Sequence, residues 1–254
     1  MRVSLTTPAI VLRTRPFGES DKIVSFFTQT YGKLTGIAKG ALRSRKRFVN
    51  SLDTFSLVNL SFYDRSHSHL AFLLSAELIH SARSITTELG RIAHASYLVE
   101  VTRGLVGGRE TNPAIFQHLQ EGLAHLESNG PSLRFLTFFE LKLLRLTGYQ
   151  PVLDRCRKCS DSGFSEISQW HFSPLDGGIL CDSCARSCRE VLPVGRRAVE
   201  ILTALQSETD HLPAPLSLPA SVVAEIRSVV LRFIQFQMDR EIKSAPFLNQ
   251  FSSV

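Results

Sequence analysis

The stretch that decides the fold is TFSLVNLSFY, residues 54–63. Its side chains alternate between two faces: Val58, Leu60 and Phe62 lie on one, and Leu57, Asn59 and the other odd-numbered positions lie on the other. A period of two residues is typical of a β-strand, because successive side chains point to opposite sides of a sheet. The alternation therefore predicts a strand.

The residues on either side of this strand predict a small β-barrel. Three shorter strands are expected before it, over Ala9–Arg15, Ile23–Thr28 and Leu34–Ala38, with the turn signal Thr30–Lys33 between the last two. Leu70–Ile79 fits a fifth strand or a helix, since periodicity alone does not separate them. The OB-fold is the five-stranded barrel that binds oligonucleotides. The alternative is an SH3-like or other small barrel with no role in binding nucleic acid.

Helical patterns follow the barrel. One helix is expected over Glu88–Leu105, and a second begins where Asn112 caps the helix and Pro113 takes its first position. Ser132–Thr147 is apolar on most faces, which predicts a central, buried helix that ends before Gly148.

Two more helices are expected near the C-terminus. They span residues 195–206 and 221–243 and are separated by the proline-rich link Leu212–Pro219. The apolar stripe of the last helix is expected to pack back on the helices of residues 81–148.

These patterns predict an α+β protein in which an OB-fold barrel precedes an all-α body with an inserted zinc-binding segment. We expect the barrel in residues 1–80 and the first part of the helical domain in 81–148. The zinc-binding segment is expected in 149–192, and the C-terminal part of the helical domain in 193–254.

The net charge of the chain is concentrated in Gly32–Leu52. This stretch holds six cations and no carboxylate, and the whole chain has 29 Lys plus Arg against 23 Asp plus Glu, a net charge of +6. The six cations are Lys33, Lys39, Arg43, Arg45, Lys46 and Arg47. A local positive excess on a neutral body predicts a docking surface for a polyanion, most often nucleic acid, although a solvated loop also fits. Phe48 and Tyr31 are candidates for stacking on bases, with packing in the barrel as the alternative.

The five cysteines all lie between Cys156 and Cys188. Cys156 and Cys159 form one C-x-x-C pair, and Cys181 and Cys184 form a second. Two such pairs can supply four thiolates in a tetrahedral shell, which predicts one structural Zn²⁺. The alternatives are free thiols or a site that has lost its metal. Cys188 is a spare buried thiol or a substitute ligand, and His171 packs beside Trp170 or is a further ligand.

No enzyme signature is present. Four thiolates close the zinc shell, whereas a catalytic zinc keeps an open position. The sequence has no H-x-E with P-C-x-x-C, no P-loop, no G-x-S-x-G and no H-E-x-x-H. We therefore expect no catalytic residues. The N-terminus lacks an apolar secretion signal, and no apolar run is long enough to span a membrane, so a cytoplasmic protein is expected.

Short motifs in a specific order resemble the RecO family of bacterial recombination mediators over essentially the whole chain. The matching pieces are Ala9–Arg15 with Glu19–Ile23, Tyr31–Lys33, Lys39–Ala41, Phe139–Leu144 leading into Gly148–Pro151, Leu153 with Cys156 and Cys159, Phe172–Pro174 with Gly177, Gly178 and Cys181, and Lys243–Ser244 with Phe247–Leu248. The chain departs from the family pattern by adding Cys188 and by having Ser160 where a glycine is common.

The resemblance implies a protein that binds single- and double-stranded DNA without sequence preference and anneals complementary strands. It implies RecR, and often RecF, as partners that help load RecA onto DNA covered by single-strand binding protein. It also implies that the protein is associated with the nucleoid. The acidic, apolar tail of that binding protein needs a groove rimmed by cations, and Arg134, Lys142 and Arg145 on the helix Ser132–Thr147 are the candidates. The alternative is that these three cations simply snorkel from a buried helix. Without the resemblance, the residues also fit a zinc-ribbon protein-interaction module without a DNA function, or a zinc hydrolase.

Overall fold

The computed structural model describes residues 3–64, 70–162, 169–208 and 218–251. The chain forms two compact units, residues 1–130 and 131–254, and each is described by itself below. The predicted boundaries at residues 80, 148 and 192 remain a prediction. Most of the predicted link Leu212–Pro219 lies outside the described residues.

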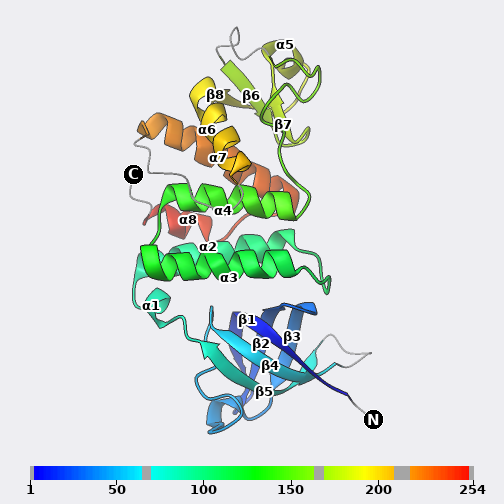
Figure 1. Ribbon diagram of the computed structural model, residues 1–254, viewed down its shortest axis with the longest axis vertical. Helices are drawn as coiled ribbons and strands as arrows, with labels where there is room; N and C mark the ends of the chain where they lie inside the picture. The colour runs from blue at the N-terminus through cyan, green and yellow to red at the C-terminus, as the bar shows by residue number, and fades with distance from the viewer. Residues whose placement is uncertain (1–2, 65–69, 163–168, 209–217, 252–254) are drawn as a thin grey trace. The chain divides into compact units, whose positions relative to one another are not determined.

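The first unit contains a closed five-stranded barrel with the strand order β1-β2-β3-β5-β4 (Figure 1). The strands are β1 (Ser4–Phe17), β2 (Asp21–Thr28), β3 (Gly32–Ala38), β4 (Leu57–Tyr63) and β5 (Ala71–His80). All neighbours are antiparallel except β3 and β5, which are parallel. This arrangement is the predicted OB-fold, and the stretch over residues 70–79 forms its fifth strand.

The face of β4 that carries Val58, Leu60 and Phe62 points into the barrel, where all three side chains are fully buried. Gly36 on β3 makes room for Leu73 of β5, because a Cβ at Gly36 would lie 2.4 Å from the Leu73 side chain. The alternation in the sequence and one glycine therefore determine how the barrel core is filled.

Helices cover part of the outer surface of the barrel. The first unit contains α1 (Arg83–Thr86), α2 (Leu89–Leu105) and α3 (Pro113–Asn129). The predicted cap of α3 is confirmed, since Asn112 Oδ1 accepts a hydrogen bond from the backbone N–H of Ile115 at 3.1 Å. The ring of Phe116 on α3 lies 6.1 Å from the ring of Phe27 on β2. Helix α3 therefore covers the outer face of β2 at this level.

The second unit combines helices with a small three-stranded antiparallel sheet of order β7-β6-β8 (Figure 1). Its elements are α4 (Leu133–Leu146), β6 (Gln169–Ser173), β7 (Gly178–Leu180), α5 (Asp182–Ala185), β8 (Leu192–Gly195), α6 (Arg196–Ser207), α7 (Ala220–Met238) and α8 (Ala245–Asn249). The short 3-10 helix η1 (Ala41–Arg43) belongs to the first unit.

Helix α7 is the central element of the second unit. It packs against α4, α6 and β8, so within this unit its apolar stripe meets one of the helices predicted for residues 81–148. The Phe233 and Phe172 rings lie 5.3 Å apart, which joins α7 to the sheet. The helix ends at Met238, earlier than predicted, because Asp239 adopts a left-handed conformation with φ of 50°.

Among the described residues, no helix is both long enough and apolar enough to cross a membrane.

Candidate nucleic-acid surface and metal centre

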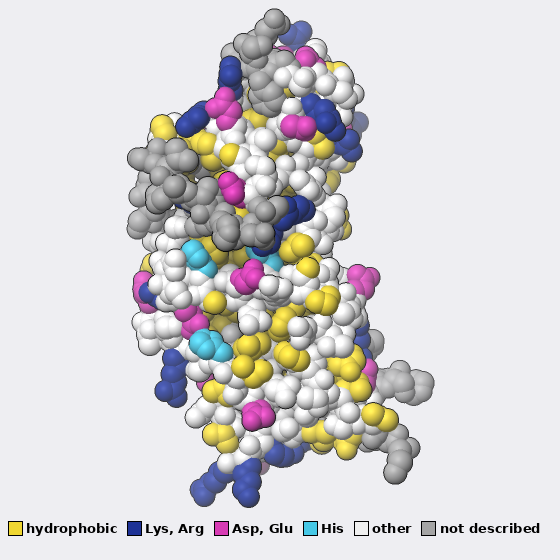
Figure 2. Space-filling view, in the orientation of Figure 1, with side chains coloured by type: hydrophobic (Ala, Val, Ile, Leu, Met, Phe, Trp, Pro, Cys, Tyr) yellow, Lys and Arg dark blue, Asp and Glu magenta, His cyan; other side chains and the backbone are white. Residues whose placement is uncertain are grey.

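Four of the six predicted DNA-binding cations are displayed on the loop between β3 and β4. Arg43, Arg45, Lys46 and Arg47 are exposed, and Figure 2 shows Lys and Arg side chains gathered at the lower end of the barrel. No carboxylate of the described residues forms an ion pair with these four cations. We call them the loop cations below.

The loop has a defined conformation at its base. The backbone N–H of Gly40 donates to Asp21 Oδ1 at 2.8 Å, and Leu42 N–H donates to Ser20 O at 2.9 Å. The hydrogen bond from Lys39 is the largest cause that lowers the pKa of Asp21, and the Lys39 Nζ–Asp21 Oδ2 distance is 2.7 Å. These contacts attach the loop to the turn between β1 and β2.

The other two predicted cations are already engaged within the first unit. Lys33 Nζ donates to the carbonyl oxygens of Arg103 at 3.0 Å and Val106 at 2.8 Å, at the C-terminal end of α2. A cation at this end of a helix satisfies its last carbonyl groups. Lys33 therefore connects β3 to α2, and its predicted contact with phosphate has no support in this geometry.

The aromatic candidates are also packed. Phe48 is 5% exposed and belongs to the barrel core, with the Arg47 guanidinium 5.3 Å from its ring centre. This burial speaks against the base-stacking role predicted for Phe48. Tyr31 packs edge-on against Phe62 with ring centres 5.5 Å apart, in agreement with the packing alternative.

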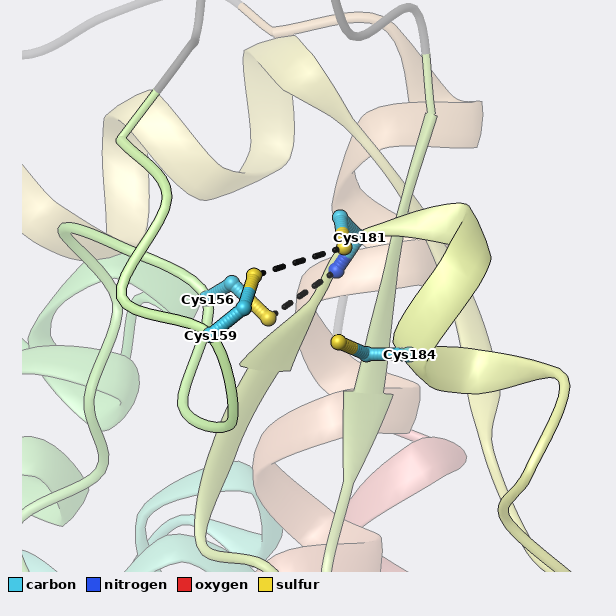
Figure 3. A group of neighbouring side chains, drawn as sticks. All are labelled: Cys156, Cys159, Cys181 and Cys184. Atoms are coloured by element: carbon cyan, nitrogen blue, oxygen red, sulfur yellow. Dashed lines mark hydrogen bonds between the residues drawn. The ribbon is translucent and has the colours of Figure 1, made fainter.

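The four cysteines of the two C-x-x-C pairs converge in the second unit. Their Sγ atoms all lie within 4.8 Å of one another. Cys156 and Cys159 come from the loop after α4, whereas Cys181 and Cys184 flank the start of α5, and all four side chains point toward a common centre (Figure 3). This cluster can bind a metal ion such as zinc.

Local hydrogen bonds shape the two cysteine turns. Cys156 N–H donates to Asp161 O at 2.7 Å, and Ser160 N–H donates to Cys156 O at 2.9 Å. Ser160 has φ of 62°, a left-handed conformation that glycine adopts more easily. On the other side, Cys181 N–H points at Cys156 Sγ at 3.5 Å. The two turns are thereby held face to face.

The electrostatics of the cluster fit a cation. Burial raises the pKa of Cys156, but hydrogen bonds from the backbone of Cys159, Cys181 and Lys158 outweigh it and lower this pKa to about 6. Burial and the neighbouring cysteine side chains raise the pKa of Cys184 to about 12. Four adjacent thiolates would repel one another, so a divalent cation at their centre would be needed for all four to ionise.

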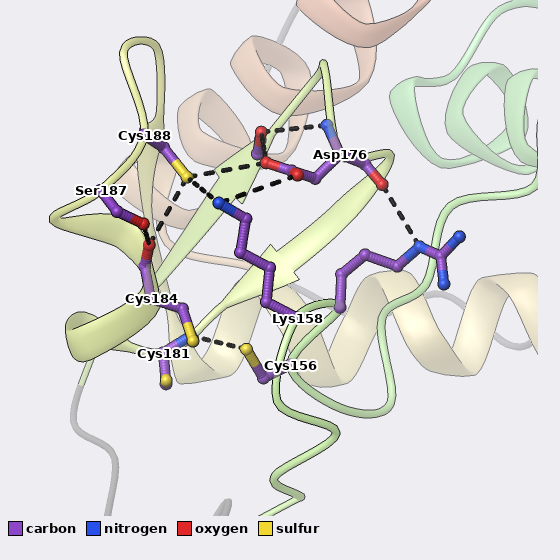
Figure 4. A network of polar contacts seen from close by, with 9 residues as sticks. Cys156, Lys158, Asp176, Cys181, Cys184, Ser187 and Cys188 are labelled. Carbon is purple, nitrogen blue, oxygen red and sulfur yellow. Dashed lines mark hydrogen bonds and ion pairs between the residues drawn. The ribbon is translucent and has the colours of Figure 1, made fainter.

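The remaining candidates lie outside the cluster. His171 Nε2 lies 2.7 Å from Asp182 Oδ1, so this histidine pairs with a carboxylate. Lys158 Nζ donates to Cys188 Sγ at 3.0 Å, and Cys188 Sγ lies 3.6 Å from Asp176 Oδ2 (Figure 4). Cys188 is partly exposed, which corrects the expectation of a buried thiol.

The three candidate partner-binding cations share one face of α4. They lie three or four residues from one another or from Phe138, the spacing that brings side chains onto one face of a helix. Lys142 Nζ lies 5.9 Å from the Phe138 ring centre. All four side chains are partly exposed. The helix therefore brings the three cations together around an aromatic ring.

Family models match nearly the whole chain. The N-terminal model of recombination protein O matches residues 1–82, and its C-terminal model matches residues 86–246. The chain belongs to the RecO family.

Full-length RecO relatives agree with this assignment. The DNA repair protein RecO of Syntrophus aciditrophicus (strain SB) is 33% identical over 252 residues, covering 98% of this chain and 96% of the relative. The DNA repair protein RecO of Syntrophotalea carbinolica is 34% identical over 253 residues, covering 97% of this chain and 95% of the relative. In this chain, the OB-fold barrel carries the loop cations and the second unit carries the cysteine cluster.

Proposed function

We propose that this RecO-family protein is a non-catalytic recombination mediator of the cytoplasm and nucleoid. It binds single- and double-stranded DNA without sequence preference and anneals complementary strands. With RecR, and with RecF where it is required, it helps to load RecA onto DNA covered by single-strand binding protein. Membership of a DNA repair family supports the general role, and the finer steps are our proposal.

The observation that carries the proposal is the position of the loop cations on an OB-fold. A phosphate backbone is neutralised by Lys and Arg, and this attraction is independent of sequence. Four exposed cations project from one loop whose base is held by Asp21 and Ser20. Binding that does not read bases suits a protein that anneals any complementary pair.

The test is an annealing assay with purified protein and two complementary oligonucleotides. We expect faster annealing with naked strands and with strands covered by single-strand binding protein. A variant in which Arg43, Arg45, Lys46 and Arg47 are all alanine should lose most of this acceleration. Wild-type protein that neither binds nor anneals DNA at low salt would contradict the proposal.

We also propose that the cysteine cluster holds one structural Zn²⁺. A shell of four thiolates is closed to substrate, so the metal joins the two cysteine turns and does not act on a substrate. The convergence of the four Sγ atoms within 4.8 Å supports this role.

The face of α4 with Phe138 and its three neighbouring cations is our proposed site for the tail of single-strand binding protein. An acidic tail that ends in apolar residues needs both positive charge and an apolar contact. Phe138 and the three cations are all partly exposed on this face, so both kinds of contact are available to a tail.

A further inference from the structure

We propose that Cys188 and Lys158 form a site of reversible oxidative modification beside the cysteine cluster. Hydrogen peroxide oxidises the thiol of Cys188, and the amine of Lys158 then captures the oxidised sulfur in a covalent S–N bond, a sulfenamide. The modification goes beyond the proposed function, because it requires neither DNA nor a partner protein.

The two atoms that form the bond are already in contact. Lys158 Nζ lies 3.0 Å from Cys188 Sγ, a separation from which a nucleophile can attack an adjacent atom (Figure 4). The two residues are 30 positions apart in the sequence. Lys158 lies between the cysteines of the first C-x-x-C pair, whereas Cys188 follows the second pair. The fold of the second unit therefore creates this pair.

A carboxylate completes the group. Asp176 Oδ2 lies 3.6 Å from Cys188 Sγ, and Asp176 Oδ1 lies 4.0 Å from Lys158 Nζ. The carboxylate is itself held in the turn between β6 and β7, because Ser173 Oγ donates to Asp176 Oδ2 at 2.6 Å and accepts from the Asp176 N–H at 3.1 Å. Attraction between the carboxylate and the ammonium group keeps the lysine side chain against the sulfur.

A small oxidant can reach this pair. Cys188 is partly exposed, and the side chain of Lys158 is 38% exposed. Cysteines in partly exposed, electropositive surroundings are the reactive ones, and oxidation selects them. The four cysteines of the cluster would be engaged by a bound metal, and Cys188 lies outside that set. In the zinc-loaded protein, Cys188 is therefore the thiol that peroxide should oxidise first.

The first chemical step oxidises the sulfur. An S–O bond forms and the O–O bond of hydrogen peroxide breaks, so the sulfur of Cys188 loses two electrons and the peroxide is reduced. The thiol becomes a sulfenic acid, and one water molecule is released.

The second step joins the two side chains. The ammonium group of Lys158 gives one proton to the solvent, and the resulting amine attacks the sulfur of Cys188. The S–O bond breaks, and the leaving hydroxide takes a second proton from the nitrogen and departs as water. Sulfenic acids condense with a backbone nitrogen in the same way. In sum, one thiol, one ammonium group and one hydrogen peroxide yield the S–N bond, two water molecules and one proton.

The new bond links the two cysteine turns. Lys158 belongs to the first turn and Cys188 directly follows the second, so the bond closes a loop across the metal site. A covalent link of this kind stabilises a fold mainly by restricting the unfolded chain. The oxidised second unit should therefore depend less on its metal ion for stability.

The experiment treats the zinc-loaded, full-length protein with hydrogen peroxide and measures the masses of the intact chain and of its tryptic peptides. We expect the loss of two hydrogen atoms, a peptide pair that joins Lys158 to Cys188, and no cleavage by trypsin after Lys158. Dithiothreitol should reverse all three changes, because thiols reduce the S–N bond to a free thiol and a free amine.

Two variants separate the steps. Lys158→Arg keeps the positive charge but has no amine, so its Cys188 should stop at the sulfenic acid, which is one oxygen atom heavier and reacts with dimedone. Cys188→Ser should show neither product at this position. A Cys188 that stays unmodified in wild type, or that is joined to another cysteine in place of Lys158, would overturn the inference.

Thermal unfolding after zinc chelation tests the consequence. Chelation should lower the unfolding temperature of peroxide-treated wild type less than that of untreated wild type. In Lys158→Arg, treatment should give no such protection, because the bond to the first turn cannot form. Equal protection of wild type and Lys158→Arg would contradict a stabilising link between these two residues.

Discussion

Ser160 stands in a backbone conformation that costs energy for any residue with a Cβ. Its φ of 62° lies in the left-handed region, in the turn that follows Cys156 and Cys159. We expect Ser160→Gly to stabilise the zinc-loaded protein by about 0.5–1 kcal/mol. Glycine removes the steric cost of the left-handed conformation in the folded state, and the greater entropy of glycine in the unfolded chain offsets only part of this gain. Chemical denaturation at constant zinc measures the change. Ser160→Ala keeps the Cβ and should bring no gain, so an equal gain in both variants would contradict this reason.

The cysteine cluster predicts that the stability of the second unit depends on a bound metal ion. Purified protein should contain about one zinc per chain, and Cys159→Ser should lose it, because three thiolates hold the ion less tightly than four. Metal analysis and thermal unfolding measure both effects. Cys188→Ser is the matched control, since this thiol contacts Lys158 and Asp176 outside the cluster. Zinc loss from Cys188→Ser, or metal-free wild type with full stability, would show that the ligand assignment is wrong.

The loop between β3 and β4 is the element that should set the salt dependence of DNA binding. If its four cations each contact one phosphate of a single strand, replacing all four by alanine should flatten the slope of log K against log salt by about 3. The barrel should unfold at nearly the same temperature, because the four side chains are exposed and the contacts of Arg47 with Lys39 O and the Phe48 ring lie at the surface. Binding titrations at several salt concentrations measure the slope.

The control for the loop variant carries the same change in net charge elsewhere. Arg186, Arg189, Arg196 and Arg197 are exposed in the second unit, and their replacement by alanine should leave the slope nearly unchanged. An equal effect of the two variants would mean that total charge, and not the loop, determines DNA binding.

At the scale of the whole molecule, we propose that DNA and the tail of single-strand binding protein bind to different units. Arg145→Glu on α4 should weaken binding of a tail peptide by about tenfold, through lost attraction and added repulsion. Annealing of naked DNA should be kept, because the loop cations are untouched. Both are measured on the same preparation, with Arg189→Glu as the control for the charge change. Peptide affinity that holds while annealing falls would move these cations to the DNA surface.

The sequence by itself determined the parts of this protein that depend on local spacing. Strict alternation over residues 54–63 specified which face of β4 enters the barrel, because the side-chain period of a strand is two. The two C-x-x-C pairs specified a four-thiolate cluster, since each pair fits on one turn. Motifs spread along the chain were enough to indicate the RecO family.

Only the tertiary structure decided which cations and aromatic rings are exposed to a binding partner. Lys33 belongs to the basic stretch in the sequence, yet its ammonium group donates hydrogen bonds to the carbonyl oxygens of residues 103 and 106. Phe48 lies among cations in sequence but is buried, whereas Phe17 is displayed at the β1–β2 turn. These outcomes depend on contacts between residues far apart in the chain. A local pattern cannot contain them, because burial is determined by what packs against a side chain.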